Sequence, residues 1–294
     1  MGRTWIGISG WRYGPWRGTF YPAKWPQKRE LEYAASKFNS VEINGSFYSL
    51  QRPDSYLAWY EQTPKDFVFA VKGGRFITHM KKLRDVETPL ANFFASGVLG
   101  LKEKLGPILW QFPPNMPYDV GRFEAFFKLL PRNTNEAAAL AKTHDAKLKH
   151  GALTKADRRR PIRHAVEIRR NEFVVPEFLC LLRKHRIAFC FADTAGRWPY
   201  TEDITSDFVY IRLHGAEELY ASGYSESMLD WWASRVTAWR EGSEPRDARH
   251  VIKAAAPRAP KGRDVYVYFN NDAKVKAPFD AMALAQRLCG KEEA

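Results

Sequence analysis

The sequence is poor in cysteine and has no long apolar run. Its 294 residues include only Cys180, Cys190 and Cys289, which are spaced too widely for a C-x-x-C metal or redox motif or for a disulfide framework. We expect all three to be reduced thiols packed in the core. No window approaches the 18 uninterrupted apolar residues of a membrane span, and the apolar stretch at the N-terminus is too short for a signal peptide. We therefore expect a soluble, cytoplasmic protein that does not contact a membrane.

Several sequence motifs that mark cofactor or metal enzymes are also missing. The first predicted strand is followed by Ser9-Gly10-Trp11-Arg12-Tyr13-Gly14, which is not the G-x-G-x-x-G turn of a dinucleotide-binding fold. The chain has no G-x-S-x-G elbow of a serine hydrolase, and neither His-x-His nor His-Glu-x-x-His spacing. We therefore expect no flavin or nicotinamide cofactor and no bound metal.

Acidic residues are outnumbered by basic ones. The formal net charge is +13, from 46 Lys and Arg against 33 Asp and Glu, which favours acidic partners, nucleic acid among them. The region 142–170 holds ten basic and three acidic residues, a local balance of +7. This stretch is interpreted either as a solvated loop or as a surface that binds phosphate groups.

The chain is rich in core material and alternates strand-like with helix-like segments. Hydrophobic residues make up 45% and aromatic residues 14% of the chain, which excludes a wholly disordered protein. Strands are predicted at 5–9, 40–44, 67–72, 107–112, 163–169, 187–193, 207–214 and 264–270. Helices are predicted at 28–38, 53–62, 89–104, 121–130, 172–185, 227–240 and 279–288.

Eight strands with helices between them favour a (β/α)8 barrel of the TIM type over a doubly wound sheet. We expect residues 1–294 to form a single domain of this α/β class. The connection 195–206 is short and contains Pro199, so the helix after the sixth strand is predicted to be degenerate. The segment 133–160 is predicted to be a basic surface insertion, with a strong local helix former at 136–142.

Polar side chains end the predicted strands on a common face. Because successive side chains of a strand point to opposite sides, Glu167 and Arg169 share one face of their strand, and Arg212 and His214 share one face of theirs. Unpaired buried charge is costly, so these four groups require close pairing or a solvated pocket. Further residues are placed at or near strand C-terminal ends, where a barrel carries its active site: Trp11, Glu42, Asn44, Tyr48, Lys72, Gln111, Asp193, Asn270 and Asn271.

We interpret these residues as a ligand-binding ring, with Glu42, Glu167 and His214 as the acid and base groups. The other ring residues would bind the substrate, and the guanidiniums of Arg169 and Arg212 suit a phosphate or carboxylate. A structural reading stays open beside this one. Glu42 and Glu167 could neutralise the arginines, Lys72 and Gln111 could fill barrel layers, and His214 could be a hydrogen-bonded core residue.

Several sequence blocks, taken together and in order, resemble the YecE-like family, a domain of unknown function, and the resemblance spans almost the whole chain. The matching blocks are Ile8-Ser9-Gly10-Trp11, Phe20-Tyr21-Pro22, Val41-Glu42-Ile43-Asn44, Ser46-Phe47-Tyr48, Phe69-Ala70-Val71-Lys72, Trp110-Gln111-Phe112-Pro113-Pro114, Glu167-Ile168-Arg169, Asp193-Thr194, Tyr210-Ile211-Arg212-Leu213-His214-Gly215 and Tyr268-Phe269-Asn270-Asn271-Asp272. The resemblance implies a TIM-barrel-like fold, but it implies no reaction, substrate or cofactor.

Three functions follow as hypotheses. The first is a protein that binds a small anionic or phosphorylated ligand, a sugar or a nucleotide, with carboxylate acid and base chemistry of the hydrolase, lyase or isomerase kind. The second is a nucleic-acid-binding or processing factor that uses the basic 142–170 stretch. The third is a metal-dependent hydrolase or isomerase, which interleaved arginines disfavour because they repel a cation. Whether the protein is an enzyme, and in which oligomeric state it acts, stays open at this stage.

Overall fold

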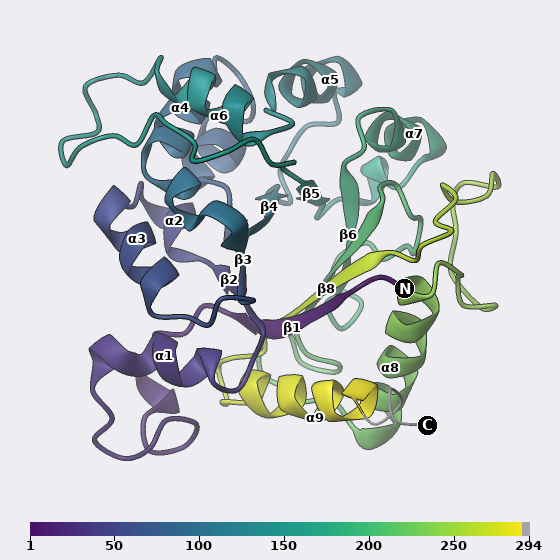
Figure 1. The fold of residues 1–294 in the computed structure, drawn as a ribbon. Helices are drawn as coiled ribbons and strands as arrows, with labels where there is room; N and C mark the ends of the chain where they lie inside the picture. Colours follow the sequence, from purple (N-terminus) through teal and green to yellow (C-terminus); the bar gives the residue numbers. More distant parts are fainter. Residues whose placement is uncertain (290–294) are drawn as a thin grey trace. The chain divides into compact units, whose positions relative to one another are not determined.

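The computed structural model describes residues 1–289, and its eight strands form a closed parallel barrel in sequence order. The strands are β1 (Thr4–Ser9), β2 (Ser40–Ile43), β3 (Val68–Lys72), β4 (Leu105–Gln111), β5 (His164–Glu167), β6 (Ala188–Asp193), β7 (Phe208–Leu213) and β8 (Asp264–Phe269). The sequence prediction of a (β/α)8 barrel is thereby confirmed (Figure 1).

Helices lie between most of the strands. They are α1 (Glu30–Ala35), α2 (Gly45–Tyr48), α3 (Pro53–Glu61), α4 (Glu87–Ala95), α5 (Val120–Leu129), α6 (Thr134–Ala141), α7 (Pro176–Lys184), α8 (Glu226–Arg240) and α9 (Ala277–Cys289), with short 3₁₀ or π turns η1 (Gly14–Trp16), η2 (Gln27–Arg29), η3 (Phe76–Met80), η4 (Val98–Lys104) and η5 (Asn171–Phe173). The connection from β6 to β7 contains no helix, as its proline and short length predicted. Within residues 1–289 no helix is both long and apolar enough to cross a membrane.

Contacts along the chain divide it into two compact units. Unit 1 comprises Met1–Val41 and Glu167–Ala294, and unit 2 comprises Glu42–Val166. Each unit is described by itself below.

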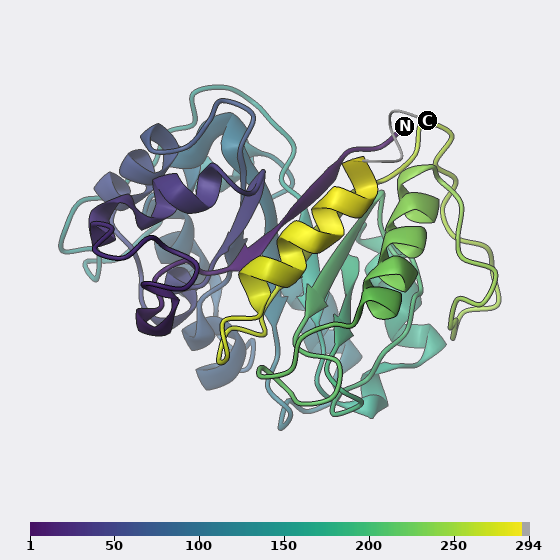
Figure 2. The same cartoon turned by 90° about the horizontal axis from the view of Figure 1, so that it is seen from below.

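In unit 1 the strands β6, β7, β8 and β1 pair in parallel, with Arg212 of β7 in register with Ala192 of β6 and Tyr268 of β8. One face of these strands carries stacked aromatic side chains, such as Trp5 on Tyr266, whose ring centroids are 4.7 Å apart. The opposite face packs on helices: Phe191 of β6, for example, contacts Trp239 of α8. Figure 2 shows α9 lying along β1 with α8 beside it, so the helical layer covers this second face.

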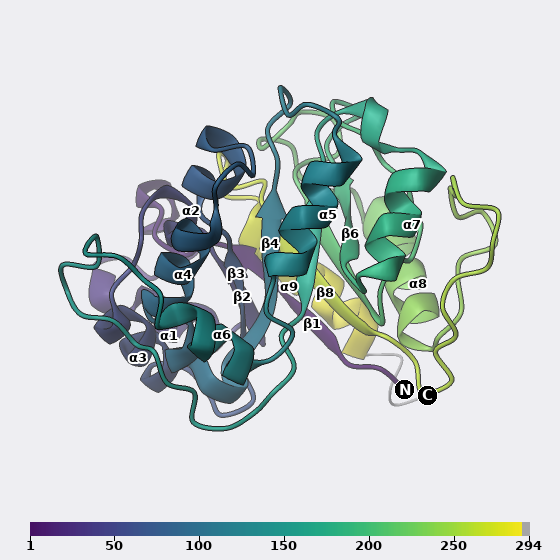
Figure 3. The same ribbon diagram turned by 90° about the horizontal axis from the view of Figure 1, so that it is seen from above.

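Unit 2 packs its helices on β3 and β4 through aromatic residues. Trp110 of β4 meets Phe93 of α4 and Phe126 of α5, with ring centroids 5.5 and 5.2 Å away. The α6 helix, which begins the predicted insertion, lies against α4 (Figure 3). The side chain of Asn133 caps α6 by accepting hydrogen bonds from the backbone N–H groups of residues 135 and 136.

Two sequence predictions about local structure are wrong. The helix expected over 89–104 is broken into α4 and η4 by Gly97, which has a φ of +121° and whose Cβ, if present, would lie 2.6 Å from the Cα of Pro53. Of the cysteines only Cys190 is buried, whereas Cys180 and Cys289 are exposed. Cys180 lies opposite the buried face of α7, because Leu179 and Leu182 take the inward positions of that helix.

Candidate ligand-binding site

A buried ion pair lies at the C-terminal ends of β5 and β7. Glu167 is the last residue of β5, and Arg212 of β7 donates from Nη1 to its Oε2 at 2.6 Å. Each side chain is only 1% exposed. Because both charged groups have lost their water, their attraction offsets the cost of burying them.

A second guanidinium shares the same carboxylate. Arg169 lies two residues beyond Glu167 and donates from Nε to Oε1 at 3.0 Å, while its Nη2 donates to the hydroxyl of Tyr220 at 3.2 Å. Its guanidinium carbon lies 3.7 Å from the ring centroid of Trp198, a cation–π arrangement. The side chain of Arg169 is 13% exposed, so solvent reaches it more readily than Glu167 or Arg212.

A buried histidine completes the group. The Nδ2 of Asn270 lies 2.9 Å from Nδ1 of His214, within hydrogen-bond distance. The other ring nitrogen, Nε2, lies 3.9 Å from Oε2 of Glu167 and 3.4 Å from Nη1 of Arg212. An imidazole held at one nitrogen and facing a carboxylate with the other is suited to moving a proton.

We call the group formed by Glu167, Arg169, Arg212, His214 and Asn270 the arginine cluster. The sequence predicted all five residues, and the structure brings them together within unit 1.

Two further residues support the arginine cluster. Ser9, which ends β1, accepts from Nη2 of Arg212 at 3.0 Å, and the face alternation of β1 predicts it at the strand end on the same face as Trp5 and Gly7. Tyr220 lies in a loop, where no periodicity exists, so the sequence gives no signal for its contact with Arg169.

Asp193 and Asn271, which the sequence placed in the same ring, lie on the helix-facing side of their strands. Burial raises the pKa of Asp193, and its carboxylate is hydrogen-bonded to the hydroxyl of Tyr224. The Nδ2 of Asn271 donates to Asp280 of α9 at 2.7 Å and to the carbonyl of Ser222 at 2.9 Å. The alternation of β6 explains the first case: Asp193 shares a face with Phe191, which packs on α8.

Two more residues of unit 1 lie near this group. Trp11 is 6% exposed, and its carbonyl accepts from the Tyr21 hydroxyl at 2.6 Å, so its indole is a core side chain. Burial raises the pKa of Asp272, and the positive charge of Arg212 opposes this shift.

The remaining predicted residues belong to unit 2. Glu42 and Gln111 are buried, and the Nζ of Lys72 lies 4.1 Å above the ring of Phe47. Asn44 precedes α2, and Tyr48 is 64% exposed, with the guanidinium of Arg75 5.5 Å from its ring centroid. The single ring that would join these residues to the arginine cluster stays a prediction.

A buried histidine that sequence reasoning did not single out lies in the core of unit 2. The indole Nε1 of Trp110 donates to Nδ1 of His164 at 3.2 Å, and Nε2 of His164 lies 2.8 Å from the carbonyl of Pro131. Burial lowers the pKa of this imidazole from 6.5 to about 3. Both ring nitrogens are satisfied by neutral groups, so His164 has a structural role.

The basic insertion is a surface feature. Six of its basic side chains are exposed, namely Lys142, Lys147, Lys149, Lys155, Arg158 and Arg159. Arg160 differs, because it donates to Asp157 in a bidentate pair and also lies 3.7 Å from Glu103. The exposed members therefore form the part of the insertion that can meet an anionic partner.

The described residues offer no metal-binding cluster. Within 1–289 no group of three or more His, Cys, Asp or Glu side chains is placed to hold a metal ion. The carboxylate and histidine set that the third sequence hypothesis needs is therefore not assembled among them.

Comparison with known proteins identifies relatives of this chain. It is 29% identical over 114 residues to the UPF0759 protein YunF of Bacillus subtilis and 35% identical over 101 residues to the UPF0759 protein YecE of Escherichia coli K12. These matches cover 37% and 30% of this chain, and only 39% and 37% of the two relatives.

Solved structures resemble the whole chain. A DUF72 family protein from Thermotoga maritima superposes with a TM-score of 0.73 at 24% identity, over 97% of this chain and 99% of that one. A DUF72 family protein from Enterococcus faecalis superposes with a TM-score of 0.69 at 16% identity, over 98% of this chain and 96% of that one. These similarities show the fold. The family model described as "Protein of unknown function DUF72" matches residues 5–294, and the chain therefore belongs to the DUF72 family.

Proposed function

We propose that this protein binds a small anionic or phosphorylated ligand, a sugar or nucleotide derivative, at the arginine cluster. The carrying observation is that two guanidiniums, Arg169 and Arg212, share one carboxylate, Glu167. An anion would add to the partners of Arg169, the more exposed of the two guanidiniums, in a site where water is largely excluded.

Arg169 is the residue that would meet the ligand. Its Nε and Nη2 are used by Glu167 and Tyr220, and the two N–H groups of Nη1 make no hydrogen bond to any residue in 1–289. Glu167 fixes the plane of this guanidinium from behind, and Trp198 supports its face. A guanidinium held in this way recognises phosphate or carboxylate oxygens with little loss of side-chain entropy on binding.

Acid and base chemistry would fall to His214. Glu167 is tied to two arginines, so its carboxylate acts as the counter-ion that orients them. Nε2 of His214 lies 3.9 Å from Oε2 of this carboxylate and can exchange a proton with a ligand or with Glu167. A ligand at Arg169 would place its reacting atoms close to this imidazole. The chemistry is then a proton transfer of the kind that hydrolases, lyases and isomerases use.

The test is ligand binding by wild type and by Arg169→Ala, measured by isothermal titration with inorganic phosphate and a panel of sugar phosphates and nucleotides. The matched control is Arg170→Ala, because Arg170 is the next residue and pairs with exposed Glu172. We expect binding to weaken at least about tenfold in Arg169→Ala and to stay unchanged in Arg170→Ala. Equal binding by all three proteins, or binding of none of the anions by wild type, would remove the basis of the proposal.

A second candidate function is nucleic-acid binding through the basic insertion. The observation that favours it is the exposure of its lysines together with Arg158 and Arg159. Affinity for single strands should fall steeply as salt rises, and replacing Arg158, Arg159 and Arg160 by Ala should reduce the salt slope. Replacing Lys24, Lys28 and Lys37, which are exposed and lie outside the basic stretch, by Ala gives the charge-matched control. Binding that does not respond to salt would speak against this function.

A further inference from the structure

A cavity of about 210 Å³ lies on the helix-facing side of β6, within unit 1 and outside the arginine cluster. Its polar lining includes Asp193 and Thr194 at the end of β6, together with Arg249. Its aromatic lining includes Trp198, Tyr200, Trp231 and Trp232. The volume is below that of pockets for drug-sized ligands, so it suits a single six-membered ring.

The aromatic walls meet at right angles. Trp231 and Trp232 of α8 are edge-to-face, with an interplanar angle of 88°, and Tyr200 meets Trp232 at 84°. A flat base sandwiched between two rings makes full use of parallel faces, whereas perpendicular rings form a corner that fits a ring with thickness. Trp231 is 41% exposed, although it is a large aromatic residue.

The polar groups of the cavity are balanced in charge. The carboxylate of Asp193 accepts from the Tyr224 hydroxyl and from the backbone of Ala195, and a carboxylate has lone pairs for about four hydrogen bonds. Arg249 supplies only donors, with its guanidinium 6.0 Å from the ring centroid of Tyr200. One acceptor group and one donor group of opposite charge match hydroxyl groups, which both donate and accept.

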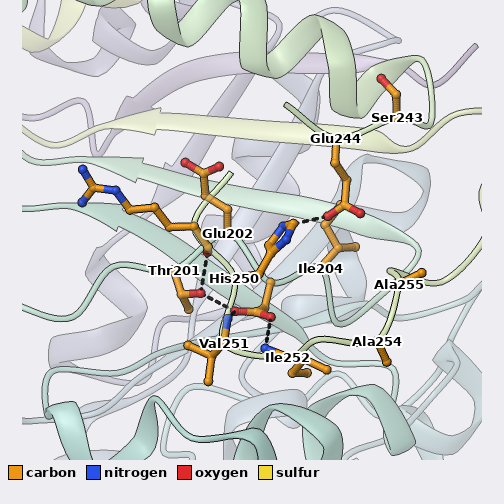
Figure 4. Close-up of polar contacts among 12 residues, drawn as sticks. Thr201, Glu202, Ile204, Ser243, Glu244, His250, Val251, Ile252, Ala254 and Ala255 are labelled. Carbon is orange, nitrogen blue, oxygen red and sulfur yellow. Dashed lines mark hydrogen bonds and ion pairs between the residues drawn. The ribbon is translucent and has the colours of Figure 1, made fainter. Parts of the chain in front are cut away.

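The segment that carries Arg249 is anchored. The Arg249 carbonyl accepts from the backbone N–H of Glu202 at 2.8 Å and from the hydroxyl of Thr201 at 2.9 Å. Beyond it, the carboxylate of Asp203 accepts from the backbone N–H groups of Val251 and Ile252 at 2.8 and 2.9 Å. Figure 4 shows Val251 and Ile252 close to Thr201. The cavity wall is therefore preorganised, which lowers the entropic cost of binding.

We propose that this cavity binds one neutral pyranose ring, the ring of a hexose or of a glycoside. The C–H groups of the sugar would pack on Trp231 and Trp232, and its hydroxyls would bond to Asp193 and Arg249. A free cation suits the site poorly because of Arg249, and a free anion suits it poorly because of Asp193. The cavity shares Trp198 with the arginine cluster, where Arg169 lies over that ring, but its polar groups, Asp193 and Arg249, are different from those proposed to bind an anion.

The test is saturation-transfer NMR and Trp fluorescence titration of the full chain with uncharged methyl glycopyranosides, and with adenosine as a planar competitor. The variants are Trp231→Ala and Asp193→Asn, and far-UV circular dichroism checks that both fold. Trp25→Ala is the matched control. Both Trp231 and Trp25 are partly exposed and have an arginine over the ring, with Arg235 3.7 Å from the centroid of Trp231 and Arg29 4.9 Å from that of Trp25.

We expect at least one glycoside to bind in the millimolar range, and to bind about tenfold more weakly to both cavity variants but not to the control. Absence of saturation transfer from every glycoside would overturn the inference. So would tighter binding of adenosine, or equal binding by all four proteins. Repeating the titration with inorganic phosphate present separates the two sites, because glycoside binding should not change whether or not phosphate binds the protein.

Discussion

Two buried carboxylates of unit 1, Asp203 and Glu167, are equally hidden from solvent but have different kinds of partner. Asp203 is 1% exposed and accepts from the hydroxyl of Thr201 and from two backbone N–H groups. Glu167 is also 1% exposed, but it accepts from two guanidiniums. The partners of Asp203 are neutral and local to the anchored segment, whereas those of Glu167 are charged groups with further donors.

This difference separates a structural carboxylate from a functional one. Backbone N–H groups have one hydrogen each, so the bonds to Asp203 consume their capacity and hold a loop. A guanidinium has five N–H donors, so Arg169 can hold Glu167 and a ligand at once. The type of partner, more than the depth of burial, therefore indicates which carboxylate serves a site.

The largest expected effect is the loss of stability on removing Asp203, the structural carboxylate of the two. Replacing Asp203 by Ala should lower the free energy of unfolding by about 4 kcal/mol, because two buried N–H groups lose their acceptor. Urea denaturation followed by circular dichroism measures this. Asp203→Asn, which keeps one oxygen, should lose less, and phosphate affinity of the folded protein should not change in either variant. A large loss of phosphate affinity in Asp203→Asn would mean that the two carboxylates are not functionally distinct.

Removing the charge of Glu167 should affect both stability and binding. Glu167→Gln removes the carboxylate that Arg169 and Arg212 share, so we expect a loss of about 3 kcal/mol in unfolding free energy. The same change raises the positive charge of the arginine cluster, so a phosphate ligand should bind more tightly to the folded variant and stabilise it more. Denaturation with and without phosphate measures both effects. Loss of stability with no gain in phosphate binding would reduce Glu167 to a structural ion-pair partner.

His164, like Asp203, is a buried ionisable group whose hydrogen-bond partners are neutral. Because its pKa is lowered to about 3 in the folded protein and is 6.5 for the free side chain, the unfolded chain binds a proton between these values that the folded protein does not. The contribution of His164 to the free energy of unfolding should therefore fall as pH falls, by about 1.4 kcal/mol per pH unit between roughly pH 6 and pH 4. His164→Asn should show a shallower dependence in urea titrations at several pH values. Identical slopes would contradict a neutral, buried His164.

The smallest expected effect concerns the residue next to the arginine cluster. Arg170→Ala should leave the melting temperature unchanged within error, since an exposed ion pair with Glu172 is screened by solvent. Arg169→Ala, one position earlier, should lower it, because the Glu167 carboxylate then loses one of its two cationic partners. Differential scanning calorimetry in one buffer compares the melting temperatures of the two variants. Equal changes in melting temperature would show that the ion pair of Arg169 with Glu167 stabilises the protein no more than an exposed ion pair does.

The strand pattern was predictable from the sequence because it depends on local periodicity. Alternation at 207–214 correctly put Arg212 and His214 on one face, and the same rule put Glu167 beside Arg169. The rule failed for Asp193, since alternation tells which residues share a face but not which face looks toward the helices. It also failed at Gly97, where a packing contact with Pro53 decides the backbone angle that ends α4.

The sequence by itself determined the order and type of the elements, the barrel they form and the residue types at the strand ends, because hydrophobic period and turn chemistry are local properties of the chain. The tertiary structure alone decided that Arg169 and Arg212 share one carboxylate, that Tyr220 and Ser9 join them, and that Asp193 belongs to an aromatic cavity with Arg249. These contacts join residues up to 203 positions apart, and only packing of the strands and loops brings such residues within hydrogen-bond distance.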